Sequence, residues 1–187
     1  MKLDRHGQAK ILSKAEEAKL FADGFTSDRD RALFGICLYT GCRISEACKL
    51  LAVDVYNAIG VRAKILIRKG NTKGKQETRT VPTHPKLKAY LETYQSSRAN
   101  LFPGRHGLGH IHPSSADAIL RAACDRVGLE GISTHSFRRS ALTRMSAAGV
   151  PLRTIQKISG HKSLNELQKY LEVSEEQVEQ AIALLGE

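Results

Sequence analysis

One stretch of this chain, residues 61–82, departs from the helical pattern of apolar residues on either side, and it constrains the fold more than any other feature. Residues 61–68 and 77–82 have the pattern of short strands, and the polar segment 69–76 between them contains two glycines. Two strands joined in this way predict a β-hairpin. We therefore expect a mainly α-helical protein with one small antiparallel β-sheet, an α+β fold.

Helices are expected on both sides of this hairpin. Ser13 and Glu16 have the spacing of a capping box, which predicts a helix that ends at Gly24. A second helix is expected from about Asp28 to Gly41. Residues 96–113 have the composition of a loop. One further helix is expected to begin at Pro85. The other expected helices cover residues 44–51, 114–127, 135–148, 151–159, 164–171 and 174–185.

The length and composition indicate one domain. A chain of 187 residues fits a single domain with its own core, and we expect this domain to span residues 1–187, with 174–187 as a C-terminal tail helix. The sequence has neither an apolar run near the ~18 residues of a membrane span nor a secretory signal. The four cysteines form no Cys-x-x-Cys pair, so buried free thiols in a reducing cytoplasm are expected.

The distribution of charge favours a polyanionic partner. Residues 1–161 contain 27 Lys and Arg against 13 Asp and Glu, whereas residues 162–187 contain 2 against 6. Within residues 61–88 nine basic residues accompany one acid, Glu77. A basic body of this kind suits nucleic acid, and the acidic tail is expected to stay away from it.

Two helix beginnings carry residues suited to binding an anion. His135 and Arg138 are three residues apart in an expected helix start, so they lie on one side near its N-terminus. Arg43 follows the glycine that ends the preceding helix, and Glu46 is one turn further on. A guanidinium at such a place can bind a phosphate in bidentate fashion. From the residues alone, a solvated helix start and a local Arg43–Glu46 ion pair are the alternatives.

A turn at Gly160 separates His161 from Tyr170, which follows nine residues later. On one unbroken helix these two side chains would point to opposite sides, because nine residues make two and a half turns. The break at Gly160 allows His161 to lie in the turn while Tyr170 projects from the next helix. A tyrosine that belongs to the core or to an interface is the alternative.

The chain as a whole resembles the tyrosine recombinases of the phage integrase family, over about residues 10–175. The resemblance is carried by motifs in the order and spacing of that family: residues 40–47, the basic hairpin, residues 135–138, the Gly160-His161 pair and Tyr170. It implies the catalytic-domain fold of these DNA breaking-rejoining enzymes. It also implies a site-specific recombinase that cuts and rejoins DNA through a 3′-phosphotyrosyl intermediate, without metal or ATP.

The resemblance assigns roles to individual residues. Arg43 and Arg138 would bind the scissile phosphate, and His161 would donate a hydrogen bond to one of its oxygens. Tyr170 would attack the phosphorus, with His135 assisting the transfer of its proton.

Further roles follow for the hairpin and its surroundings. Lys73 would protonate the leaving 5′ oxygen, with Lys69 as the competing candidate, and Glu46 would support Arg43. The residues expected to contact DNA are Arg68, Lys69, Lys75, Arg79 and Arg139.

The expected chemistry does not require a metal ion. A phenol with a pKa near 10 needs a base or a strong positive field in order to attack, and guanidinium groups supply such a field. Metal-dependent phosphoryl transfer needs clustered carboxylates, whereas residues 131–170 contain a single acid, Glu166. We therefore expect no cofactor. The three histidines of the loop are expected to face DNA rather than a metal ion: His106, His110 and His112.

Members of this family usually carry an N-terminal DNA-binding domain, which we do not expect in this chain because the catalytic pattern begins almost at its first residue. The expected partners are double-stranded DNA and further copies of the chain, which would associate on DNA through the C-terminal helix. A cytoplasmic, nucleoid-associated protein of bacterial or phage origin is expected. A type IB topoisomerase and a catalytically silent DNA-binding module are the alternatives.

Overall fold

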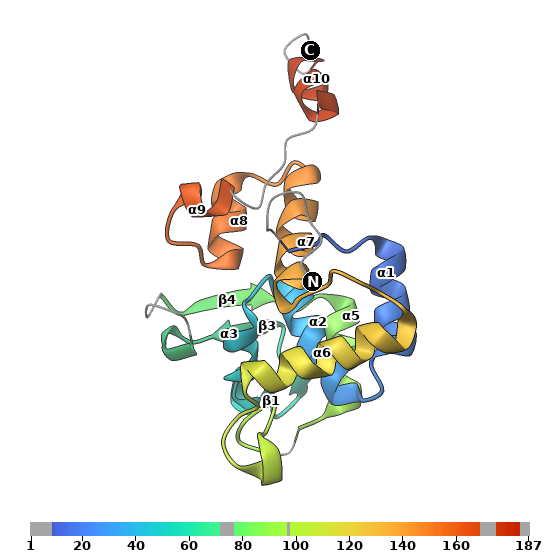
Figure 1. Cartoon of the computed structure of the whole chain (residues 1–187). Helices are drawn as coiled ribbons and strands as arrows, with labels where there is room; N and C mark the ends of the chain where they lie inside the picture. Colours follow the sequence, from blue (N-terminus) through green and yellow to red (C-terminus); the bar gives the residue numbers. More distant parts are fainter. Residues whose placement is uncertain (1–8, 72–76, 97, 169–174, 184–187) are drawn as a thin grey trace.

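The β-hairpin lies within a set of helices in the computed structural model, which describes residues 9–71, 77–96, 98–168 and 175–183 (Figure 1). The helices before it are α1 (Lys14–Lys19), the π-helix η1 (Leu20–Gly24), α2 (Asp28–Thr40), α3 (Ile44–Cys48) and α4 (Ala52–Val55). The strands are β1 (Tyr56–Asn57), β2 (Gly60–Val61), β3 (Lys64–Ile67) and β4 (Arg79–Pro82), with the 3-10 helix η2 (Lys69–Asn71) after β3. Then follow α5 (Pro85–Tyr94), the 3-10 helix η3 (Arg105–Gly107), α6 (Pro113–Val127), α7 (Thr134–Ala147), α8 (Leu152–Ser159), α9 (Leu164–Gln168) and α10 (Glu175–Ala183).

The caps of the first two helices are those that the sequence predicts. Ser13 Oγ accepts a hydrogen bond from the Glu16 backbone N–H at 3.1 Å, and Glu16 Oε2 accepts one from the Ser13 backbone N–H at 3.0 Å. The helical run ends at Gly24, although its last part is a π-helix. Gly41 ends α2 in the left-handed region with φ 62°, where glycine avoids the steric cost of a Cβ.

The predicted helix over residues 44–51 is wrong in its second half. Helix α3 ends at Cys48, and Ala52 begins a separate helix. The cause is a contact distant in sequence, because the Leu101 N–H donates to the Leu50 carbonyl at 2.8 Å and the Ala52 N–H donates to the Ala99 carbonyl at 2.9 Å. Backbone groups that pair with residues 99–101 cannot also continue the helix.

The predicted hairpin is confirmed, but it is shorter than expected. Strands β3 and β4 pair antiparallel, with Ile65 opposite Val81 and Ile67 opposite Arg79. Ile65, Ile67 and Val81 are buried, so these pairs lie on the inner face of the sheet. A second two-stranded sheet, β1 with β2, takes Val61 out of the predicted strand and was not expected.

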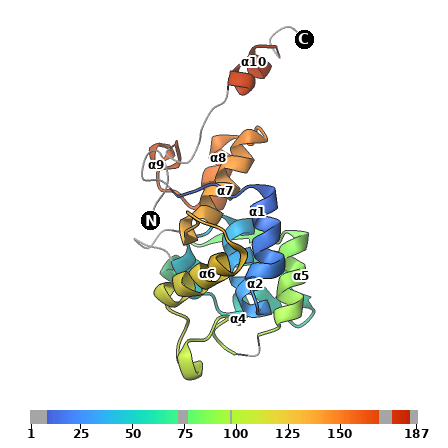
Figure 2. The same cartoon turned by 45° about the vertical axis from the view of Figure 1, so that its right-hand side comes forward.

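The core is centred on α2, which packs against α5 and α7 (Figures 1 and 2). Its aromatic part joins distant elements, since Phe34 lies 4.8 Å from Phe25 and 5.1 Å from Phe137 between ring centroids. All four cysteines are buried free thiols, as predicted. The Phe34–Phe137 contact packs the first turn of α7 against the middle of α2.

The last helices extend from this core. Helix α8 packs against α7, α9 and β4, whereas both views show α10 away from the rest of the described chain (Figures 1 and 2). The tail helix expected over residues 174–185 is confirmed for Glu175–Ala183. Among the described helices, none combines the length and the apolar character needed to cross a membrane.

Candidate active site

Arg138 occupies the centre of the candidate site, where three helix ends meet. Its side chain is 1% exposed in the first turns of α7. Its Nη1 donates to the Gly41 carbonyl at 2.5 Å and to the Ser159 carbonyl at 2.9 Å. These carbonyls lie at the C-terminal ends of α2 and α8, which carry partial negative charge and suit a guanidinium. Arg138 therefore fixes α7 to both helix ends.

His161 lies against Arg138 in the turn after α8. Gly160 forms the turn with φ 68°, and His161 is 6% exposed. The His161 Nε2 atom is 2.9 Å from Arg138 Nη2, and its Nδ1 atom is 2.7 Å from Ser159 Oγ. Arg138 Nη2 also lies 3.2 Å from Nδ1, but Nε2 is the nearer ring nitrogen. Because a guanidinium can only donate, we assign Nε2 as the acceptor and place the ring proton on Nδ1. Nδ1 then donates to Ser159 Oγ, which donates in turn to the Gln156 carbonyl at 3.3 Å.

The surroundings of His161 favour its neutral form. Burial, as the largest cause, and the charges of Arg138, Arg43 and Arg79 together lower the pKa of His161 to about 3. The imidazole is therefore uncharged near neutral pH.

Glu46 connects two arginines beside this histidine. Its carboxylate is fully buried and accepts from the Arg43 backbone N–H at 2.8 Å. Arg43 Nη1 lies 3.7 Å from Glu46 Oε1, which is an ion pair without a hydrogen bond. The bidentate partner of Glu46 is Arg79, at 3.3 Å from Oε1 and 3.0 Å from Oε2. Sequence reasoning placed Glu46 with Arg43 but missed its contact with Arg79.

The described site has an excess of positive charge. Three guanidinium groups, those of Arg43, Arg79 and Arg138, face one carboxylate and a neutral imidazole, so 3 − 1 leaves +2. Such an excess in a buried place favours a bound anion, since unpaired charge is costly away from water. The arrangement is therefore suited to a phosphate group.

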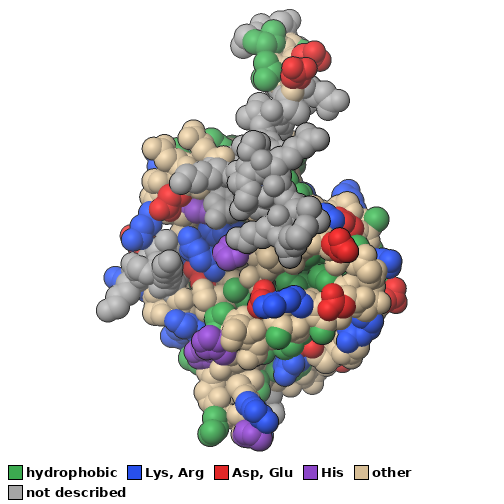
Figure 3. All heavy atoms as spheres, in the orientation of Figure 1, with side chains coloured by type: hydrophobic (Ala, Val, Ile, Leu, Met, Phe, Trp, Pro, Cys, Tyr) green, Lys and Arg blue, Asp and Glu red, His purple; other side chains and the backbone are tan. Residues whose placement is uncertain are grey.

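A basic groove of about 770 Å³ opens beside His161 between β4 and α8. Three exposed basic side chains line it, Arg153, Lys157 and Lys162, and Glu77 is the one acid among its described lining residues. Figure 3 shows basic and histidine side chains gathered on the face where α8 lies above the sheet. A groove of this charge next to the site can accommodate a polyanion.

The structure places the remaining predicted residues less centrally. His135 is exposed at the start of α7, and Lys69 is exposed after β3. Arg68 pairs with the buried carboxylate of Asp54 at 2.6 Å while its own side chain stays 45% exposed. Lys73, Lys75 and Tyr170 lie outside the described residues.

Two arginines that we expected to contact DNA are directed inward. The Arg79 side chain is 8% exposed because it shares the inner face of the sheet with Val81. Arg139 is also 8% exposed, and its Nη1 donates to the Ala9 carbonyl at 2.7 Å. Both guanidinium groups bond within the protein, although Arg79 also lines the groove beside His161, and the expected DNA contacts of Arg79 and Arg139 stay predictions.

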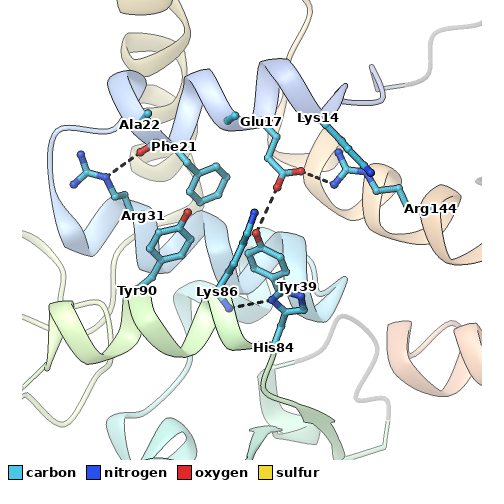
Figure 4. A pocket seen from close by; sticks show the side chains of 11 residues that line it. Lys14, Glu17, Phe21, Ala22, Arg31, Tyr39, His84, Lys86, Tyr90 and Arg144 are labelled. Atoms are coloured by element: carbon cyan, nitrogen blue, oxygen red, sulfur yellow. Dashed lines mark hydrogen bonds and ion pairs between the residues drawn. The ribbon is translucent and has the colours of Figure 1, made fainter.

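A second cavity of about 630 Å³ lies between α1, α2, α5 and α7 and contains none of the predicted site residues (Figure 4). Two of its arginines are engaged within the protein: Arg144 pairs with Glu17, and Arg31 Nε donates to the Phe21 carbonyl at 3.0 Å. Tyr39 stacks on His84 with 4.4 Å between ring centroids. In the described part of the chain, no three His, Cys, Asp or Glu side chains form a group that could hold a metal ion.

The geometry agrees with the comparison to known sequences. The profile of the phage integrase family matches residues 5–177, and the chain belongs to this family. The tyrosine recombinase XerA of Thermococcus onnurineus is 30% identical over 160 residues, which cover 83% of this chain and 55% of that protein. The tyrosine recombinase XerD of Mycobacterium leprae is 32% identical over 161 residues, which cover 80% of this chain and 49% of that protein. The chain thus spans about half the length of these curated relatives.

Solved structures confirm the expected fold. The crystal structure of XerA recombinase superimposes with a TM-score of 0.77 at 21% identity, covering 94% of this chain and 64% of that chain. The structure of the Tn1549 transposon integrase in complex with transposon right end DNA gives a TM-score of 0.78 at 16% identity, covering 98% of this chain and 68% of that chain. The described helices and sheets are those of a tyrosine-recombinase catalytic domain.

Proposed function

We propose that this chain carries the chemistry of a site-specific DNA recombinase, which cuts and rejoins DNA through a 3′-phosphotyrosyl link to Tyr170. The observation that carries the proposal is the group formed by Arg43 with the buried Arg138 and the buried, neutral His161, with its excess of positive charge. The related tyrosine recombinases and the phage integrase profile support it.

The proposed reaction is a phosphoryl transfer without a metal ion or ATP. The Tyr170 hydroxyl gives up its proton with the assistance of His135, and its oxygen forms a bond to phosphorus while the bond to the 5′ oxygen breaks. The 5′ oxygen receives a proton from the general acid. A phosphodiester with one charge and a phenolate with another give a transition state near −2, which the +2 of the described site would stabilise. Rejoining reverses these steps with the 5′ hydroxyl of the second strand, so the energy of the cleaved phosphodiester bond is conserved in the phosphotyrosyl link.

The other tyrosines are poorly suited to act as nucleophiles. Burial raises the pKa of Tyr56 to about 12, and it also raises the pKa values of Tyr39, Tyr90 and Tyr94. The Tyr56 hydroxyl donates to the Leu91 carbonyl and the Tyr94 hydroxyl to the Leu101 carbonyl, away from Arg138. The fifth tyrosine is Tyr170, which favours it as the nucleophile.

The general acid belongs to the β3–β4 connection in this proposal. Lys73 is the preferred residue, with Lys69 as the competitor. A substrate with sulfur in place of the 5′ bridging oxygen separates the two, because sulfur leaves without being protonated. Cleavage of this substrate should be rescued in Lys73→Ala, whereas rescue in Lys69→Ala alone would assign the role to Lys69.

DNA is the proposed partner, bound along the basic groove beside His161. Self-association on DNA through the C-terminal helix is the second part of the proposal. Its support is the described helix α10, on which Val178 is 54% and Ile182 is 64% exposed. Burial of apolar side chains of this size in an assembly would contribute favourable free energy to association.

The central experiment is the capture of covalent DNA adducts. A library of nicked duplexes with randomised sequence is incubated with the protein, and DNA that stays attached in detergent is recovered and sequenced. Adducts should be enriched for one motif and should be absent with Tyr170→Phe, which keeps duplex binding. Adducts without any sequence preference, together with relaxation of supercoiled DNA, would favour a topoisomerase. Binding without adducts would favour a DNA-binding module.

A further inference from the structure

Arg79 makes hydrogen bonds to two separate parts of the candidate active site, although it lies on a strand. Its position opposite Ile67 puts its side chain on the inner face of the sheet. Its two terminal nitrogens donate to both oxygens of Glu46, in the helix that follows Arg43. Its Nε donates to the Ile158 carbonyl at 3.0 Å, three residues before His161. One guanidinium thus joins the hairpin, the Arg43 segment and the His161 turn.

Gly160 lies directly against this guanidinium. A Cβ at position 160 would lie 2.7 Å from Arg79 Nη1 and 2.9 Å from Arg79 Cζ, which is closer than atoms can approach. Three hydrogen bonds hold the guanidinium in place, so it cannot move away without loss. The turn before His161 is therefore packed onto Arg79 as well as bonded to it.

The contact between Arg79 and Glu46 also determines what Arg43 can do. Glu46 Oε1 and Oε2 both accept from Arg79, and Oε2 accepts from the Arg43 backbone as well. Arg43 Nη1 is buried and has no hydrogen-bond partner among the described residues. A buried N–H without an acceptor is costly, and an incoming phosphate oxygen would remove that cost. The donors of Arg43 are thus kept for a ligand.

We propose that Arg79 is a positioning residue, which occupies Glu46 so that Arg43 can bind the scissile phosphate, and which holds the turn that carries His161. The identity of the ligand, a DNA phosphate, rests on the proposed function. The role requires arginine, because the forked guanidinium reaches two carboxylate oxygens and a carbonyl at once, whereas a lysine ammonium is a single point of charge.

The first test separates positioning from DNA contact. The test compares Arg79→Lys and Arg79→Gln with the control Arg121→Gln on one duplex recovered from the adduct-capture experiment. The control breaks an exposed ion pair with Asp117 on α6. We expect duplex affinity within about 2-fold of wild type and an unchanged salt slope for Arg79→Gln, since phosphate contacts are what set that slope. We expect adduct formation by Arg79→Lys to fall about 100-fold in single turnover, as for other small misplacements of site groups.

The opposite pattern would overturn the inference. If Arg79 contacts a phosphate, Arg79→Gln lowers affinity and reduces the salt slope by about 1. Wild-type adduct formation in Arg79→Lys would also overturn it.

A second test needs no DNA and remains valid if the proposed function fails. The ring resonances of His161, which faces Arg138, Arg43 and Arg79, are followed by NMR in the free protein. Arg79→Lys keeps the charge but removes the forked guanidinium, so these resonances should shift or broaden. Arg121→Gln should leave them unchanged. Unchanged resonances in Arg79→Lys would show that the residue does not hold the turn.

A paired variant covers the case in which a single change prevents folding. Glu46→Gln combined with Arg79→Gln removes both buried charges, and neutral replacement of a buried pair is better tolerated than removal of one partner. This double variant should recover the thermal midpoint lost in Arg79→Gln but not the rate of adduct formation. Recovery of the wild-type rate would contradict the positioning role.

Discussion

The position of one proton, on Nδ1 of His161, depends on two neighbours that differ in chemistry. Arg138 donates to Nε2, and Ser159 Oγ accepts from Nδ1. Ser159 is fully buried, so no solvent acceptor replaces its hydroxyl. The tautomer of His161 is thus determined by a serine two residues before it.

Removal of that hydroxyl should disturb the histidine more than the fold. We expect Ser159→Ala to give a mixture of His161 tautomers by ¹⁵N NMR and to slow adduct formation by roughly 3–10-fold, since a hydrogen bond contributes about 0.5–1.5 kcal/mol. Ser140→Ala is the matched control, because Ser140 is also a fully buried serine in a helix and bonds to Ser136 and Leu12. A single unchanged tautomer in Ser159→Ala would contradict this role.

The lowered pKa of His161 predicts a loss of stability in mild acid. The pKa is about 3 in the folded protein, whereas an unfolded histidine titrates near 6.5, so the unfolded state takes up the proton first. This contribution is fully present above pH 6.5 and is lost as the pH falls from there toward 3. We expect the free energy of unfolding to fall by about 1–2 kcal/mol between pH 7 and pH 5. Denaturant titrations should show a smaller fall in His161→Gln, and equal falls would refute the assignment.

At the scale of elements, the parts that could be predicted were those with local signals. The capping box at Ser13 and the glycine stops at Gly41 and Gly160 each act within one turn of their own helix. The break after Cys48 could not be predicted, because it depends on residues about fifty positions away.

The inward direction of Arg79 had a signal that we did not use. Its alternation with Val81 places both side chains on one face of the strand. The contact of Arg79 with Glu46 has no signature in the sequence, because it depends on how β4 packs against α3.

The packing of the sheet against α8 predicts an unequal effect of two similar glycine substitutions. Gly160 and Gly128 both end helices, with φ 68° and φ 65°. A Cβ at position 128 would meet nothing within 4 Å, whereas at position 160 it would meet Arg79. We expect Gly128→Ala to cost about 1–2 kcal/mol for the left-handed backbone alone, and Gly160→Ala to cost clearly more. Denaturant titrations measure both, and equal costs would mean that Arg79 moves aside freely.

At the scale of the whole molecule, the uneven charge predicts how DNA binding depends on salt. Residues 1–161 carry 27 basic and 13 acidic residues, a net charge of +14. If about 6–10 phosphates are contacted, affinity should fall by about 10³–10⁵ between 50 and 200 mM salt. A gel-shift titration with one duplex at several salt concentrations measures this slope. A flat response would show that the basic surface does not bind the DNA backbone.

The exposed apolar side chains of the acidic C-terminal helix predict that copies of the chain associate on DNA. Val178 and Ile182, four residues apart on α10, are exposed apolar side chains on one face of the helix, and burying each would contribute roughly 1.5–3 kcal/mol. In our proposal that burial occurs against a neighbouring copy on paired sites. Val178→Ser combined with Ile182→Ser should then spare binding to a single site but weaken cooperative binding to two sites in a gel shift, as should deletion of residues 174–187. Glu179→Gln is the control on the same helix. If the double variant or the shortened chain assembles on two sites like wild type, or if either unfolds, the C-terminal helix does not mediate association between copies.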